Sequence, residues 1–153
     1  MYVVMVSSDD KIVTLFAQKS APPPYGAVIW DYHVFVVHKS GTEVKVYDHD
    51  SSLDWGVDFL RYWAETMKPV PVPNADRFCR RFRVVPADVY LKTFSSDRSH
   101  MLNGDGEFIK PPPAWPLINP RKLTNLMNLL RFSENIKDTT VMNEQQMVEF
   151  FST

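Results

Sequence analysis

The chain has 153 residues, with 17 basic and 18 acidic side chains and a net charge of -1. A content of 44% hydrophobic and 23% charged residues is typical of a globular protein and argues against disorder over the whole chain. The near-neutral charge argues against nucleic-acid binding through phosphate neutralisation. No apolar run approaches the roughly 20 residues of a membrane-spanning helix. We therefore predict a single domain over residues 1–153, with neither a nucleic-acid nor a membrane partner.

Two potential β-hairpins occupy the first third of the chain. Residues 2–6 and 11–16 are rich in β-forming side chains and are separated by Ser and Asp residues that favour a turn. Residues 27–38 and 43–48 flank a Ser-Gly pair at 40–41, which indicates a second hairpin.

Two helices are predicted in the middle third of the chain. Residues 53–67 predict a helix that Pro69 ends. Its inward face comprises Gly56, Phe59, Leu60, Trp63 and Met67. Residues 78–85 predict a strand, and Pro86 then begins a short helix to Phe94.

The C-terminal third adds two more helix predictions. Asn119 and Pro120 favour a helix start, followed by Leu123, Leu126, Met127 and Leu130 at helical spacing. Asn143 and Gln146 resemble a capping box that opens a last helix, with Met147, Phe150 and Phe151 inward. The sum is an α+β fold with a mostly antiparallel sheet and flanking helices.

The second hairpin carries the strongest chemical signal. If residues 40–41 form its turn, paired residue numbers sum to 81, and His33 lies opposite Asp48. A carboxylate beside a histidine fixes the ring's orientation and stabilises its cation, as in a nucleophile–base–orienter triad. A satisfied structural His–Asp pair on the sheet is the alternative, and a one-residue slip of register would separate the two side chains.

Candidates for a nucleophile are weaker. Cys79 has arginine neighbours that could lower the pKa of a thiol, but it fits a cysteine on the flank of a strand. Asp97, Ser99 and His100 lie too close in sequence for a triad, and Asp97 or Ser99 suits a turn or cap. The four arginines of residues 77–83 suggest a solvated strand edge. Four scattered histidines show no metal-ligand spacing, so we predict no metal.

The location can also be inferred from composition. A single cysteine excludes an internal disulfide and fits a reducing compartment. Residues 1–7 are apolar but lack a basic leader and a cleavage site, so they indicate a strand and not a signal peptide. We expect a cytoplasmic or nuclear protein.

Several sequence blocks resemble one family. Residues 28–34, Val-Ile-Trp-Asp-Tyr-His-Val, look like the signature of the protein N-terminal glutamine amidohydrolases. Tyr-Asp-His-Asp at 47–50 is similar to that family's Tyr-Asp-x-Asp segment. Further similar blocks follow in the same order, at residues 82–84, 87–88, 90–92, 96–101 and 111–116. The resemblance extends from about Tyr2 nearly to the C-terminus.

The resemblance implies deamidation of an N-terminal glutamine to glutamate, the committing step of an N-degron route. It implies a Cys–His–Asp site on a papain/transglutaminase-like core, with no cofactor. His33 and Asp48 match the family's histidine and aspartate, the same two residues that the hairpin register pairs. Substrates would be proteins or peptides with N-terminal glutamine, and Asp31 and Asp97 are candidates for binding the α-amino group. The full-length form is expected to be monomeric.

The chain departs from the family at the nucleophile. The family's cysteine lies in a helical segment that precedes the strand matching residues 2–6, and Cys79 falls in a different block. We therefore expect a member that lacks its N-terminal helical segment, inactive as it stands, with an apolar surface where that segment would pack. The alternatives are a non-catalytic module that recognises protein N-termini and a hydrolase that uses Cys79.

Overall fold

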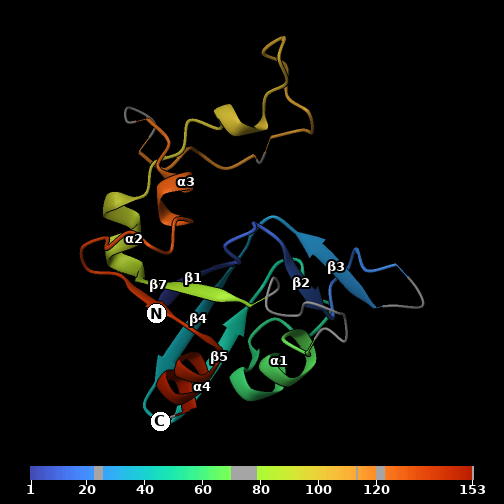
Figure 1. The fold of residues 1–153 in the computed structure, drawn as a ribbon, viewed down its shortest axis with the longest axis vertical. Helices are drawn as coiled ribbons and strands as arrows, with labels where there is room; N and C mark the ends of the chain where they lie inside the picture. Colours follow the sequence, from blue (N-terminus) through green and yellow to red (C-terminus); the bar gives the residue numbers. More distant parts are fainter. Residues whose placement is uncertain (23–25, 70–78, 113, 120–122, 153) are drawn as a thin grey trace.

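A computed structural model describes residues 1–22, 26–69, 79–112, 114–119 and 123–152 and shows an antiparallel sheet with helices on both faces (Figure 1). The sheet has six strands in the spatial order β6 (Val57–Asp58), β5 (Glu43–Tyr47), β4 (His33–Ser40), β1 (Tyr2–Ser7), β7 (Arg81–Pro86) and β8 (Thr140–Met142). A second sheet pairs β2 (Val13–Phe16) with β3 (Ala27–Trp30). The predicted α+β class is confirmed.

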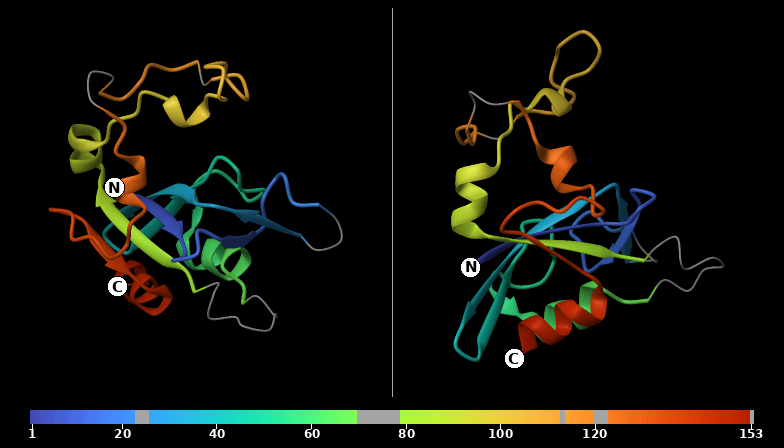
Figure 2. Two further views of the ribbon diagram at one scale, coloured as in Figure 1. Left: turned by 45° about the horizontal axis from the view of Figure 1, so that its top comes forward. Right: turned by 60° about the vertical axis from the view of Figure 1, so that its left-hand side comes forward.

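The helices divide between the two faces of the sheet (Figure 2). They are α1 (Phe59–Thr66), α2 (Ala87–Thr93), α3 (Leu126–Leu129) and α4 (Glu144–Ser152), with a 3₁₀ turn, η2 (Ser99–Met101). Because strand side chains alternate, Val4 and Val6 of β1 pack with α1 and α4, whereas Met5 packs with α3 on the opposite face. Within the described residues, no helix is both long and apolar enough to cross a bilayer.

The predicted hairpin between residues 2–6 and 11–16 is wrong. β1 pairs with β4 on one edge and with β7 on the other, and β2 pairs with β3. The near-continuous apolar run of β1 explains this, because a strand buried on both faces belongs at the centre of a sheet. The predicted single strand over residues 27–38 is also divided, since Asp31 accepts a hydrogen bond from the Tyr32 N–H and breaks it into β3 and β4.

Helix α1 begins later than the sequence predicted. Gly56 has φ +81°, and residues 57–58 form β6 instead of a helical turn. The Asp58 carboxylate caps α1 by accepting the N–H groups of Leu60 and Arg61. Phe59 and Met67 are buried as predicted and Trp63 packs against the core, but Leu60 is 54% exposed. Tyr62 and Thr66 are also buried, which the prediction missed.

The C-terminal helix predictions had mixed outcomes. Asn143 and Gln146 exchange two hydrogen bonds of 2.9 Å, which confirms the capping box of α4. Met147 and Phe151 are buried as predicted, but Phe150 is 37% exposed. Within the described residues, Asn119 does not begin a helix: α3 begins at Leu126, and Leu123 is 87% exposed.

The Asn119 amide instead donates to the Phe94 carbonyl at the end of α2. The cap prediction at Pro120 lies outside the described residues. The solvated arginine edge is wrong for Arg80 and Arg83, which are buried, while Arg77 lies outside the described residues.

An apolar groove of about 640 Å³ lies on the α2 side of the sheet. Its walls include Met1, Val36, Trp55, Tyr90 and Trp115. Three of these are among the large exposed hydrophobic side chains of the protein, namely Met1, Trp55 and Trp115. These side chains form an exposed apolar surface; that a further N-terminal segment packs on it stays a prediction.

Candidate active site

His33 and Asp48 form a buried pair beside the sheet. His33 opens β4, and Asp48 directly follows β5. The distance from His33 Nε2 to Asp48 Oδ2 is 3.0 Å, and the two side chains are 5% and 1% exposed. The two atoms are within hydrogen-bonding distance, although the ring N–H is not fully aligned with this oxygen.

The hairpin register differs from the prediction, yet the pair forms. Ser40 faces Glu43 and Val37 faces Val46, so paired numbers sum to 83 and the turn residues are 41–42. Gly41 has φ +58°, a conformation that favours glycine at this turn. A shift of two leaves every side chain on its predicted face, so Asp48 becomes a diagonal neighbour of His33, still within reach.

Two further donors hold the Asp48 carboxylate. The Tyr62 hydroxyl donates to Oδ2 over 2.8 Å, and the Asp50 N–H donates to Oδ1 over 3.0 Å. Burial favours the neutral carboxyl, but hydrogen bonding and positive charge from His33, with the bonds from Tyr62 and Asp50, outweigh it. The pKa of Asp48 is consequently lowered from its ordinary value.

The surroundings orient the imidazole. Because Nε2 faces Asp48, the carboxylate stabilises a proton on that nitrogen and leaves Nδ1 for chemistry. Nδ1 lies on the side of Asp50, whose Oδ2 is 4.0 Å away. Trp30 and Phe35 stack on the ring at centroid distances of 6.1 and 6.4 Å, which limits its tilt.

The His33 ring opens onto a pocket of about 440 Å³. The pocket is lined by Trp30, Asp31, Tyr32, His33, Val34, Asp50, Leu126 and Met127. Asp31, a predicted substrate-binding residue, therefore lies in the same pocket as His33. Asp97 does not line it, and its carboxylate accepts the Ser99 N–H in the turn before η2. The turn role predicted for Asp97 is thus confirmed.

Cys79 is the only cysteine of the sequence and does not line this pocket. It is free and exposed and lies two residues before β7. The side chain of His100 lies outside the described part of the structure. Neither Cys79 nor Ser99, the two nucleophile candidates considered in the sequence, lines the His33 pocket.

The donor atoms of His33, Asp48 and Asp50 lie within 4.8 Å of one another, a proximity that the sequence analysis did not foresee. Both oxygens of Asp48 already accept hydrogen bonds, from Tyr62 and from the Asp50 N–H. We therefore interpret the group as a base with its orienting carboxylate and assign no metal ion to it.

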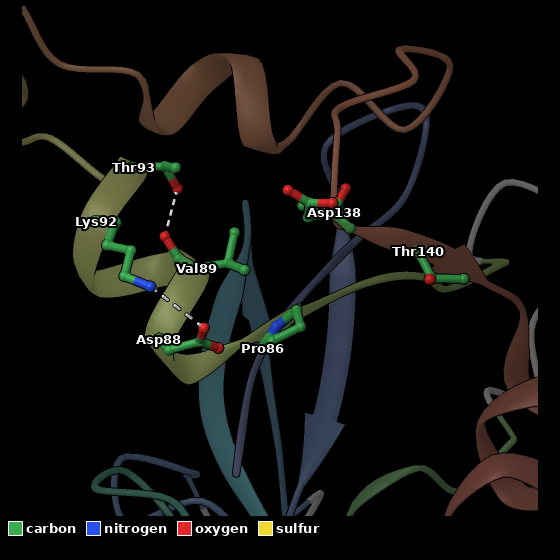
Figure 3. Close-up of a pocket in the computed structure, with 8 residues that line it drawn as sticks. Pro86, Asp88, Val89, Lys92, Thr93, Asp138 and Thr140 are labelled. Atoms are coloured by element: carbon green, nitrogen blue, oxygen red, sulfur yellow. Dashed lines mark hydrogen bonds and ion pairs between the residues drawn. The ribbon is translucent and has the colours of Figure 1, made fainter.

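A larger hollow of about 700 Å³ lies between α2 and the start of β8 (Figure 3). Asp88 and Lys92 form an ion pair of 3.6 Å on its α2 wall, and Asp138 lies across from them. Asp88 is thus already paired with a surface lysine, an arrangement of modest energetic value. We take the pocket at His33 as the site because it contains a buried base and its orienting carboxylate.

Sequence reasoning missed Tyr62 and Asp50. Tyr62 lies three residues after Phe59 and four before Thr66, a helical spacing that would have identified it once the helix was started at Asp58. Asp50 lies two residues after Asp48 in the bend that follows β5, where its N–H donates to the Asp48 carboxylate, a local hydrogen bond typical of aspartate.

Acid should weaken the fold through Asp48. Because its folded-state pKa is lowered, the ionised carboxylate stabilises the fold above about pH 4, and this contribution is lost as the pH falls through the folded-state pKa. In Asp48→Asn we expect a lower free energy of unfolding at neutral pH, by about 1–3 kcal/mol. The deficit relative to wild type should shrink below about pH 4.

Urea unfolding at several pH values measures this deficit. Asp88→Asn is the matched control, because Asp88 is an exposed aspartate that forms an ion pair with the surface residue Lys92. A deficit for Asp48→Asn that stays constant from neutral to acidic pH would contradict the linkage.

A buried histidine with an orienting carboxylate, open to a pocket, defines the base half of a hydrolase-type site. Comparison with known proteins agrees with this class. The family model for N-terminal glutamine amidase matches residues 1–151, so the chain belongs to the N-terminal glutamine amidase family. An amidase is a hydrolase that acts on an amide bond.

The chain is also similar to curated proteins named protein N-terminal glutamine amidohydrolase. The protein from Caenorhabditis elegans is 47% identical over 153 residues, which cover 99% of this chain and 83% of the relative. The protein from Caenorhabditis briggsae is 46% identical, with 82% of the relative covered. The protein from Drosophila ananassae is 44% identical over 120 residues, 76% of this chain and 57% of the relative.

Proposed function

We propose that this chain supplies the histidine and aspartate of a thiol amidohydrolase that converts an N-terminal glutamine of a polypeptide to glutamate. The observation that carries the proposal is the buried contact of 3.0 Å between His33 Nε2 and Asp48 Oδ2 at a pocket. Family membership supports the substrate, because the relatives are named for N-terminal glutamine.

The chemistry follows from the position of His33. Nδ1 takes the proton of a thiol, and the thiolate attacks the carbon of the glutamine carboxamide. The C–N bond then breaks as His33 passes its proton to the leaving nitrogen, which departs as ammonia. In the second half, Nδ1 takes a proton from water as the oxygen attacks the thioester carbon; the C–S bond then breaks, glutamate leaves, and the proton returns from Nδ1 to the sulfur. Asp48 stabilises the imidazolium in both halves.

The thiol is proposed to come from a residue outside these 153. The sole cysteine, Cys79, is exposed and does not line the His33 pocket. A papain/transglutaminase-like arrangement would supply such a cysteine from a helical segment, consistent with the antiparallel sheet that carries His33. Oxyanion donors would come from the backbone beside that cysteine.

Recognition of the α-ammonium group is assigned to Asp31, which lies in the His33 pocket. A carboxylate suits this role because it accepts charge-assisted hydrogen bonds. Asp97 is the weaker of the two predicted candidates, since its carboxylate holds the turn at Ser99.

The broader setting is also proposed. The reaction would place the protein in an N-degron route, acting as a monomer in its full-length form. A single cysteine supports a reducing compartment, the cytoplasm or the nucleus.

A second candidate function is a non-catalytic module that binds polypeptide N-termini. It is favoured by one observation, the separation of the only cysteine from the His33 pocket. Under this proposal the pocket would bind N-terminal glutamine without releasing ammonia.

The experiment compares this chain with a chimaera that adds the residues of the Caenorhabditis elegans relative lying outside the 153-residue match. Ammonia release is measured with a peptide that begins with glutamine and with its N-acetylated form as control. We expect no release by the chain alone, and release by the chimaera from the free-amine peptide only. An inactive but folded chimaera that binds the peptide would favour the module. Activity of the chain alone that Cys79→Ser abolishes would overturn the external thiol.

A further inference from the structure

We propose that Tyr62 is a positioning residue of this site, whose hydroxyl acts through Asp48 to fix the carboxylate that orients His33. This inference rests on the proposed function, because it concerns how the same base is held. Tyr62 does not line the pocket, and the hydrogen bond that the structure describes for its hydroxyl goes to Asp48 and not to His33. We therefore do not call it a catalytic residue.

The first argument concerns which carboxylate oxygen of Asp48 accepts the hydrogen bond from the Tyr62 hydroxyl. Tyr62 donates over 2.8 Å to Oδ2 of Asp48, the same oxygen that lies 3.0 Å from His33 Nε2. The other oxygen, Oδ1, accepts the Asp50 N–H. Three donors from three elements thus surround one carboxylate, which leaves it little freedom to rotate.

The second argument is the position of Tyr62 itself. Its side chain is fully buried, at 0% exposed, and its ring packs against Phe35 with centroids 5.2 Å apart. Phenylalanine would fill such an apolar site, and burying a hydroxyl costs free energy unless it is hydrogen-bonded. The hydrogen bond that the structure describes for this hydroxyl goes to Asp48, so Asp48 is the reason for a tyrosine here.

The fold holds the donor in register with the acceptor. β6 pairs with β5 through Val57 opposite Val46, and the next residue, Asp58, caps α1. Tyr62 follows one helical turn later, while β5 runs directly into Asp48. The strand pairing therefore fixes where the hydroxyl and the carboxylate meet.

The consequence is chemical as well as geometric. Burial, and then the negative charge of Asp48, raise the pKa of Tyr62 well above its ordinary value, so the hydroxyl remains a donor. A donor on Oδ2 stabilises the ionised carboxylate and lowers its basicity. Asp48 then holds the imidazolium without taking its proton, which His33 needs for the departing ammonia.

The titratable groups around Asp48 are His33 from β4, Tyr62 from α1 and Asp50 from the loop after β5. The test follows the carboxyl carbons of aspartate in this chain by NMR during an acid titration. In Tyr62→Phe we expect the titration midpoint of Asp48 to move upward by about one pH unit. A tyrosine with a purely structural role would leave this midpoint unchanged.

Tyr2→Phe is the matched control, since it removes a hydroxyl from the same core beside Phe150 and Phe151. It should leave the midpoint of Asp48 in place. An unchanged midpoint in Tyr62→Phe, or an equal change in Tyr2→Phe, overturns the proposal. If Tyr62→Phe does not fold, 3-fluorotyrosine at position 62 provides the test. Its more acidic hydroxyl is a stronger donor, so the titration midpoint of Asp48 must move downward.

A kinetic arm separates this proposal from the proposed function. In the chimaera, Tyr62→Phe should lower kcat by about tenfold with KM unchanged. The acidic limb of the pH–rate profile should move upward with Asp48. An inactive wild-type chimaera refutes the function and leaves the NMR result as the test of Tyr62. An active chimaera with unchanged kcat and pH profile in Tyr62→Phe overturns the positioning role alone.

Discussion

Replacing Arg83 with methionine is expected to lower the free energy of unfolding by about 3–5 kcal/mol. Arg83 is 1% exposed, and its guanidinium makes four hydrogen bonds within 3.0 Å. Nε donates to the carbonyl of Leu129, the last residue of α3, where helix carbonyls lack intrahelical partners. The other donors reach the Thr139 hydroxyl and the carbonyls of Arg131 and Glu134.

Methionine has nearly the length of arginine and would leave these acceptors without their donors. Arg81→Met is the matched control, because Arg81 lies on the same strand and is exposed. It should change stability by no more than about 0.5 kcal/mol. Urea unfolding measures both variants, and a loss of under about 1 kcal/mol for Arg83→Met would show that the loop between α3 and β8 does not depend on this side chain.

The two arginines of this segment show where sequence reasoning ends. Arg80 and Arg83 look like surface charges in the sequence, since arginine is mostly exposed. Their burial depends on carbonyls contributed from far along the chain, such as Thr14 and Lys68 for Arg80 and Glu134 for Arg83. Acceptors at those separations leave no periodic signal in the sequence.

The histidine–aspartate pair could be predicted because it depends on a local hairpin. Counting residues across one turn placed His33 near Asp48. The predicted register was wrong by two residues, but side chains alternate between the two faces of a strand, so both residues stayed on the same face. The pairing of β1 with β4 and β7 depended on contacts over longer separations, and local turn residues suggested the wrong partner. Tyr62 was missed for a third reason, the wrong start of α1, which placed Leu60 instead of Tyr62 on the predicted buried face.

In the chimaera, His33→Ala is expected to lower kcat by about 10³-fold or more, while the peptide still binds. The imidazole carries the proton from the thiol to the departing ammonia. Among the described contacts, the one other base near Nδ1 is the Asp50 carboxylate, 4.0 Å away. Asp48→Asn should also lower kcat, by about 10²- to 10⁴-fold, because an amide cannot stabilise the imidazolium.

His38→Ala is the matched control for this prediction. His38 lies on the same strand, β4, five residues along and therefore on the opposite face from His33. Steady-state kinetics with the glutamine peptide should give a kcat for His38→Ala within about twofold of wild type, since a surface change rarely exceeds 0.5 kcal/mol.

The two site variants together distinguish the roles of the pair. If both lose turnover and retain peptide binding, the 3.0 Å contact serves chemistry and not substrate affinity. If His33→Ala retains more than about a tenth of wild-type kcat while folded, the imidazole carries no essential proton, since a lost base costs about 100-fold at least. Loss of peptide binding in Asp48→Asn without loss of kcat would instead assign the carboxylate to substrate recognition.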